Sequence, residues 1–142
     1  AERGQREPEV LGDDAAERQP LKEVLTRCVQ LGGKVIDSSP MYGRAEEVIG
    51  DLVHELQLRE KVFLATKVWT TGEKEGRESM ERSCQRLQVK QLDLMQVHNL
   101  VDLETQLATM RAWKDEGRVH AGSGRLPDAK MRARLVELVG GG

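Results

Sequence analysis

The sequence predicts an α/β fold built on a parallel sheet. Helical and extended patterns alternate along the chain at intervals of roughly 25 to 30 residues, the rhythm of right-handed βαβ units. Three apolar runs also end on a charged or polar side chain, at Asp37, Lys67 and His98. In a parallel α/β sheet the C-terminal ends of the strands carry the loops of the active site. These three residues are therefore candidate site residues.

The elements follow from hydrophobic spacing and from helix breakers. Residues 1–20 are polar, and we expect a loose N-terminal arm there. Apolar residues recur at helical spacing over 21–31, and Gly32 and Gly33 favour a helix end after them. The elements expected next are a strand over 35–37, a helix over 44–56, a strand over 62–67, a helix over 78–87, a strand over 92–98 and a helix over 102–113.

The pattern weakens after Gly117. Residues 118–125 include two glycines and read as poor strand material, and a last helix is expected over 127–139. Gly122-Ser123-Gly124 lacks the third glycine of a dinucleotide loop, so we interpret it as a linker. The domain division expected is a polar arm over 1–20, a main unit over 21–119 and a degenerate segment with one helix over 120–142.

Composition excludes several classes of function. The 142 residues suit one domain, and a net charge of -2 gives no basic footprint for nucleic acid. No apolar run approaches the roughly 20 residues that span a bilayer, and the polar N-terminus shows no signal peptide, so we expect a cytoplasmic protein without membrane contact. Cys28 and Cys84 are expected to be buried free thiols in a reducing compartment. No Cys/His spacing indicates a metal site.

Three segments carry a combined pattern of polar residues at family spacing: Val35 to Gly50, Leu64 to Trp69 and Leu92 to Asn99. Through these segments residues 32–119 resemble the aldo-keto reductase family. The resemblance implies a (β/α)8 TIM barrel that moves a hydride between NADPH and a carbonyl compound. A complete barrel needs about 250 residues, so the fold expected for this chain is a partial barrel of about half that size.

The resemblance also assigns roles to single residues. Tyr42 is implied to be the general acid that protonates the nascent alkoxide, with Lys67 as the cation beside it. A free tyrosine has a pKa of about 10, and a neighbouring cation favours the ionised phenol. Asp37 is implied to hold Lys67 and to contact the cofactor, and His98 to orient the carbonyl oxygen. Trp69 and Asn99 match positions near the substrate in similar enzymes.

Each assigned residue has a structural alternative. Asp37 is also suited to capping a turn, Lys67 to a solvated strand end and His98 to a satisfied place in the core. Tyr42 and Trp69 are also suited to plain packing. The joint spacing of Asp37, Tyr42, Lys67 and His98 favours a site for these four, whereas both interpretations stay open for Trp69 and Asn99. The acid pairs Asp13-Asp14 and Glu46-Glu47 lack metal spacing, and we interpret them as solvated faces or as helix N-terminal acids.

Two functions remain open from sequence. The first is NADP(H)-dependent reduction of aldehydes and ketones to alcohols. The second is a truncated, non-catalytic remnant with little or no NADPH binding, because most of the family's cofactor site has no match here. A Rossmann-type dehydrogenase is disfavoured, since no strand-to-helix turn carries its glycine fingerprint. Open edges of a half-barrel predict self-association or marginal stability.

Overall fold

The structure, a computed structural model, describes residues 15–121. Within this range four strands alternate with four helices, and short 3-10 turns precede β2 and follow β3. In chain order the elements are α1 (Ala15–Gln30), β1 (Val35–Asp37), α2 (Ala45–Glu55), η1 (Arg59–Lys61), β2 (Phe63–Val68), α3 (Glu73–Leu87), β3 (Leu92–Val97), η2 (His98–Leu100), α4 (Leu103–Asp115) and β4 (Val119–Ala121). The predicted α/β fold with parallel strands is confirmed.

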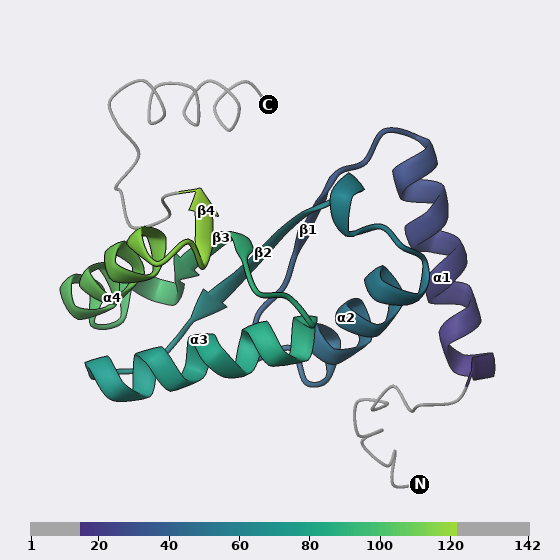
Figure 1. Ribbon diagram of the computed structural model, residues 1–142. Helices are drawn as coiled ribbons and strands as arrows, with labels where there is room; N and C mark the ends of the chain where they lie inside the picture. Colours follow the sequence, from purple (N-terminus) through teal and green to yellow (C-terminus); the bar gives the residue numbers. More distant parts are fainter. Residues whose placement is uncertain (1–14, 122–142) are drawn as a thin grey trace, which may run out of the picture.

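The sheet grows in one direction along the chain. Its strand order is β1-β2-β3-β4, so each βα unit adds its strand beside the previous one. Helices α2, α3 and α4 lie along one side of the strands, while α1 lies beside α2 (Figure 1). A doubly wound sheet reverses direction at a switch point, whereas this order continues without reversal, as in a (β/α) barrel.

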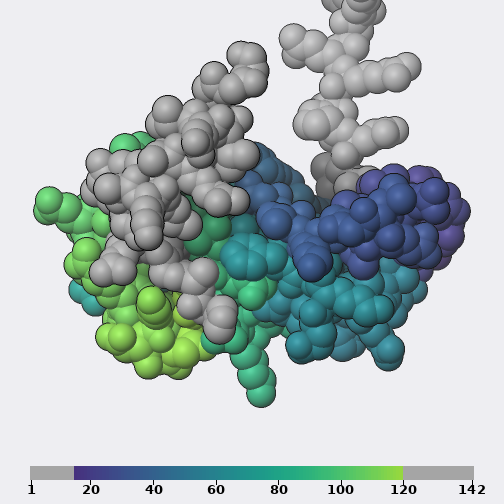
Figure 2. Space-filling model, turned by 90° about the horizontal axis from the view of Figure 1, so that it is seen from above, coloured from purple at the N-terminus to yellow at the C-terminus, as the bar shows by residue number. Residues whose placement is uncertain are grey.

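The space-filling view follows the same succession. The atoms of α1 lie at one side of the molecule, and those of α4 and β4 lie at the other (Figure 2). Within residues 15–121, β1 and β4 are the outer strands, so each has one edge without a paired strand. No helix in this described part is long and apolar enough to cross a bilayer.

The apolar core lies between the sheet and the helices. Its largest fully buried side chains include Leu64, Met80, Met95 and Trp113. The helices approach closely, since a Cβ on Gly50 of α2 would collide with the backbone of α3. Residues two apart on a strand share a face, so the face away from this core carries every second residue.

The sheet register places three polar residues on that other face. Asp37 lies opposite Ala65, and Lys67 lies opposite Gln96 on the next strand. Because Ala65 and Lys67 alternate with the buried Leu64 and Thr66, they point away from the helices. Asp37, Lys67 and Gln96 therefore share one face at the C-terminal ends of β1, β2 and β3.

Two helices begin earlier than predicted. Helix α1 begins at Ala15 instead of residue 21, within the part expected as a loose arm, and it contains Pro20. Contacts with α2 override the local signal, because Arg18 is buried and bonds to Asp51. Helix α3 begins at Glu73 instead of residue 78, since acidic residues in its first turn suit a helix N-terminus even without apolar spacing.

Two other predictions were wrong. Val119–Ala121 forms strand β4, because residues 119 and 121 pair with Leu92 and Leu94 of β3. Local composition gave no signal for this non-local pairing. Cys28 is exposed, whereas Cys84 is buried as expected. The predicted helix over 127–139 lies outside the described residues, as does Asp13-Asp14.

Candidate active site

An acid–lysine pair lies at the C-terminal ends of β1 and β2. The Lys67 ammonium donates to Asp37 Oδ2 at 2.8 Å and to the Ser38 carbonyl oxygen at 2.9 Å. The amide of Gln96, on β3, donates to Asp37 Oδ1 at 2.9 Å. The Lys67 side chain is 12% exposed and that of Asp37 is 48% exposed. Lys67 is thus largely buried and held by two hydrogen bonds, whereas the Asp37 carboxylate is half exposed.

Tyr42 reaches this pair from the loop after β1. Ser38 N donates to the Ala65 carbonyl, which attaches the start of the loop to β2. Tyr42 N donates to the Ser39 carbonyl, and Tyr42 O accepts from Ala45 N, so the loop runs directly into α2. The Lys67 Nζ lies 5.6 Å from the centroid of the Tyr42 ring, within the range of a cation–π contact. The ring itself is 52% exposed.

A second contact joins the ends of β2 and β3. The rings of Trp69 and His98 meet edge to face, with centroids 5.9 Å apart and an interplanar angle of 83°. Trp69 is half exposed and His98 is partly exposed. Trp69 follows Lys67 by two residues, and His98 follows Gln96 by two residues.

Asn99 is not drawn into either group. It is exposed, and its backbone is left-handed, with a φ of 52°. The structure therefore brings together Asp37, Lys67 and Tyr42, and separately pairs Trp69 with His98.

The loop that follows Trp69 is held by α4. Asp102 Oδ2 accepts from Gly72 N at 2.7 Å. The buried Gln106 donates from Nε2 to the carbonyl oxygens of Thr70 and Gly72, at 3.2 and 3.0 Å. These three bonds fix the loop on the helix side, so Trp69 projects from an anchored segment.

Sequence reasoning missed two residues that support the cluster. Gln96 stands two residues before His98 on the same strand face, and that alternation was a usable signal. Glu46 was predicted to be solvated or a simple helix N-terminal acid, and this prediction was wrong about its solvation. Its side chain is 1% exposed, accepts from Thr66 Oγ1 at 2.5 Å and pairs with Arg86 at 3.4 Å.

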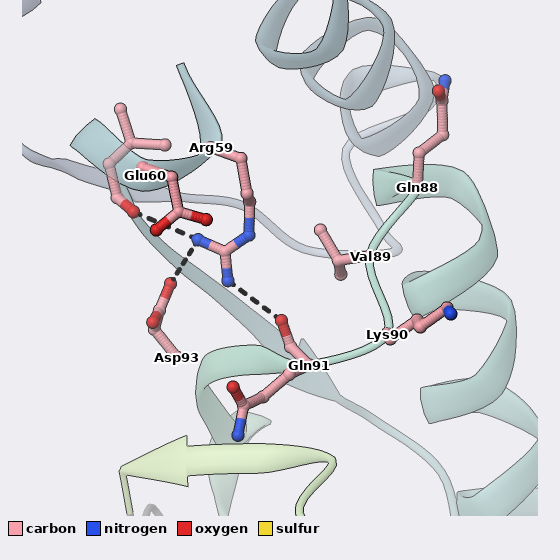
Figure 3. A pocket seen from close by; sticks show the side chains of 8 residues that line it. Arg59, Glu60, Gln88, Val89, Lys90, Gln91 and Asp93 are labelled. Carbon is pink, nitrogen blue, oxygen red and sulfur yellow. Dashed lines mark hydrogen bonds and ion pairs between the residues drawn. The ribbon is translucent and has the colours of Figure 1, made fainter. Parts of the chain in front are cut away.

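The opposite end of the sheet carries a different acid–base pair. Arg59 donates to Asp93 Oδ2 at 2.9 Å and to the carbonyl oxygens of Gln91 and Val62 at 2.9 and 3.2 Å (Figure 3). Asp93 also accepts from Leu64 N at 2.8 Å. These residues border an open depression of about 450 Å³ beside the starts of β2 and β3. The Arg59 guanidinium beside this depression is thus bonded to backbone carbonyl oxygens as well as to Asp93.

Shifted pKa values occur around α3 and β4. A hydrogen bond from Arg118 lowers the pKa of Glu81, and that bond in turn raises the pKa of Arg118. Burial raises the pKa of the Cys84 thiol to about 11. Within residues 15–121 no group of His, Cys, Asp or Glu side chains is arranged to hold a metal ion.

Consecutive parallel βα units in the order β1-β2-β3-β4 are those of part of a (β/α) barrel, and the acid–lysine pair and the tyrosine lie at the strand ends where such barrels carry their sites. Residues 10–123 match the Aldo/keto reductase family, and the chain belongs to that family. The family resemblance noted from sequence is thereby confirmed.

Individual relatives agree with this membership. Methylglyoxal reductase YeaE of Escherichia coli (strain K12) is 34% identical over 138 residues, covering 92% of this chain and 48% of that protein. Aldo-keto reductase YhdN of Bacillus subtilis (strain 168) is 32% identical over 114 residues, covering 70% of this chain and 34% of that protein. The chain thus spans less than half the length of either relative.

Solved structures show the same fold. An aldo-keto reductase from Klebsiella pneumoniae, in complex with NADPH, matches with a TM-score of 0.67 and 31% identity. The match covers 77% of this chain and 40% of that one. The fold is therefore a partial barrel of the aldo-keto reductase type.

Proposed function

We propose that this chain carries the proton-transfer part of an NADP(H)-dependent reductase that converts aldehydes and ketones to alcohols. The observation that supports the proposal best is the position of the Lys67 ammonium. It is bonded to Asp37 and to the Ser38 carbonyl, and it lies beside the ring of Tyr42. The proposal therefore pairs a phenol, as the proton donor, with a cation that lies beside its ring.

Each residue then has a chemical task. Tyr42 donates its hydroxyl proton to the carbonyl oxygen as that oxygen becomes an alkoxide. Lys67 stabilises the phenolate that remains, and Asp37 keeps the ammonium in place. NADPH, when bound, supplies the hydride that the carbonyl carbon accepts. Positioned acid catalysis of this kind typically contributes about 10²- to 10⁴-fold in rate.

The exposed groups at the strand ends would form the binding side. The Asp37 carboxylate is half exposed, so it fits the cofactor contact that the family implies. His98 and Trp69 support each other edge to face, which suits a histidine that orients a carbonyl oxygen. Asn99, the next residue, is exposed and completes the set proposed for the substrate side.

The test is NADPH oxidation by the chain with an aldehyde, compared with a Tyr42→Phe variant. Methylglyoxal is the first substrate to try, because one relative is a methylglyoxal reductase, and nitrobenzaldehyde is a broad second. Because Tyr42 is half exposed, the phenylalanine variant should unfold at the parent's temperature. A Tyr42→Phe variant that keeps the parent's kcat/KM would refute the role of the phenol.

The alternative is a non-catalytic remnant, and the same assay separates the two. A parent chain without turnover, together with no NADPH binding in a fluorescence titration, would support the remnant. Binding at micromolar or tighter affinity would exclude it.

We also propose that the chain either self-associates or, as a monomer, is only marginally stable. Among the described residues, β1 and β4 each leave one edge of the sheet unpaired, and Val35 on β1 is exposed. Unpaired edges and exposed apolar side chains favour pairing with another chain. Sedimentation should show a mass that rises with concentration, or a monomer whose melting temperature is low, and a concentration-independent monomer with a high melting temperature would contradict this.

A further inference from the structure

Glu46 is a buried carboxylate on the first turn of α2. Its side chain is 1% exposed, and it accepts from Thr66 Oγ1 on β2 and pairs with Arg86 on α3. Removing a carboxylate from water is costly unless it is paired and hydrogen-bonded. The arrangement therefore depends on both partners, one from each neighbouring element.

The bond to Thr66 connects the two halves of the proposed proton-transfer pair. Thr66 immediately precedes Lys67 and points to the helix side while Lys67 points to the open side. Glu46 follows Tyr42 closely, and Ala45 between them donates from its backbone to the Tyr42 carbonyl. The Glu46–Thr66 bond therefore links a residue four positions after Tyr42 to the residue directly before Lys67.

The loop that carries Tyr42 is attached to β2 at both ends. Its start is held by Ser38 N, which donates to the Ala65 carbonyl at 2.9 Å. Its end is held by Glu46 on Thr66, the next residue of β2. Tyr42 itself lies between these two attachments with its ring half exposed.

We propose that Glu46 is a positioning residue, which fixes the Tyr42 ring over the Lys67 ammonium through its bond to Thr66. The inference rests on the proposed function, because it gives Glu46 a purpose only if Tyr42 and Lys67 act together. Glu47 provides a matched control on the same helix turn. It pairs with Arg44 at the surface, and its side chain is 43% exposed.

The test reads the position of Tyr42 directly and requires no turnover. Tyr42 is the only tyrosine in the sequence, so incorporation of 3-fluorotyrosine gives a single fluorine resonance. Lys67→Met defines where this resonance lies without the ammonium. We expect Thr66→Val to move the parent resonance toward that position. Thr66→Ser, which keeps the hydroxyl, and Glu47→Gln should leave it at the parent position.

Two results would overturn the inference. One is a folded Thr66→Val variant whose resonance stays at the parent position. The other is a Lys67→Met variant that leaves the resonance unmoved, since the ammonium would then not lie beside the ring. If Thr66→Val does not fold, Glu46→Met breaks the same bond without leaving a buried carboxylate unpaired, and the same criteria apply to it.

Activity gives a second, separable readout. If the parent reduces a carbonyl substrate, kcat/KM should fall about 10²-fold in Thr66→Val, the size expected for a misplaced catalytic group. Thr66→Ser, which keeps the hydroxyl, should have the kcat/KM of the parent. If the parent shows no turnover, the proposed function fails while the fluorine resonance still decides whether Glu46 positions Tyr42.

Discussion

The two ends of the sheet each carry an ion pair, Lys67 of β2 with Asp37 of β1 at one end and Arg59 of η1 with Asp93 of β3 at the other, and the two pairs differ in role. At the C-terminal end Lys67 bonds to Asp37 at 2.8 Å, and at the N-terminal end Arg59 bonds to Asp93 at 2.9 Å. The distances are nearly equal. The surroundings are not, because the Asp37 side chain is 48% exposed whereas that of Asp93 is 20% exposed.

The remaining donors of each cation explain the contrast. Arg59 also donates to the carbonyl oxygens of Gln91 and Val62, so other N–H groups of its guanidinium are used on the backbone. Lys67 takes one carbonyl and lies beside the Tyr42 ring. The same kind of ion pair fixes strand starts at one end and accompanies a titratable phenol at the other. Pairing alone therefore does not identify a site.

The largest effect is expected from Lys67→Met. Loss of the ammonium beside Tyr42 should lower kcat/KM for carbonyl reduction by about 10²- to 10⁴-fold, the usual contribution of positioned acid–base groups. The free energy of unfolding should change less than the activity does, because water can solvate the half-exposed Asp37. Steady-state kinetics with urea denaturation of the same preparation checks both parts. A variant that loses stability but keeps kcat/KM would reverse the assignment of the two ends.

Arg59→Met is expected to show the opposite pattern. It removes hydrogen bonds to Asp93 and to two backbone carbonyls, and bonds of charged groups are worth about 2 kcal/mol each. The free energy of unfolding should fall by about 2 kcal/mol, less than the sum of the three bonds, because Arg59 is one third exposed and water replaces part of them, and because Asp93 keeps the amide of Leu64. Activity per folded molecule should match the parent. An activity loss comparable to that of Lys67→Met at low temperature would show that this end also acts in the chemistry.

Gln96→Leu should have a smaller effect on the C-terminal end. Asp37 loses the bond to Oδ1 but keeps Lys67. The bond to the charged carboxylate is discounted because water can replace it at the half-exposed Asp37, so we expect a loss of about 1 kcal/mol and a fall in kcat/KM of about tenfold or less. Gln96→Glu is the informative companion, because a second carboxylate beside Asp37 should repel it and lower activity further. Equal rates in all three proteins would exclude a supporting role for Gln96.

The smallest effect concerns the loss of stability at acid pH and involves the Glu81–Arg118 pair, near the N-terminal end of the sheet. Arg118 holds the pKa of Glu81 below its ordinary value of 4.5, so the folded chain binds that proton less readily than the unfolded chain. The pair therefore stabilises the fold above about pH 4.5, and this contribution is lost as pH falls through the lowered pKa. Because the Glu81 side chain is 42% exposed, we expect only about 0.2 to 1 kcal/mol. Denaturation at several pH values should show a shallower acid decline in Glu81→Gln than in the parent.

Much of the fold was predictable because its signals are local. Strand β1 was placed at its observed bounds from Val35 to Asp37, where apolar residues give way to an acid. What failed was non-local. Strand β4 exists because it pairs with β3, and α1 extends to Ala15 because Arg18 reaches Asp51 on α2.

The site divides in the same way. Strand ends and family spacing pointed to Asp37, Tyr42 and Lys67, and the structure places them together. Glu46 was missed because its burial depends on Thr66 and Arg86, which lie 20 and 40 positions further along the chain. No local pattern distinguishes it from Glu47, the exposed glutamate beside it.

The most direct test of the central claim, that Tyr42 and Lys67 act as one proton-transfer unit, is a double-mutant cycle in carbonyl reduction. Tyr42→Phe, Lys67→Met and the double variant should be compared with the parent by kcat/KM. Residues that act as a unit show strongly non-additive losses, so we predict that the double variant is no slower than the slower single variant. Losses that simply multiply would show that the two side chains act independently and would contradict the claim.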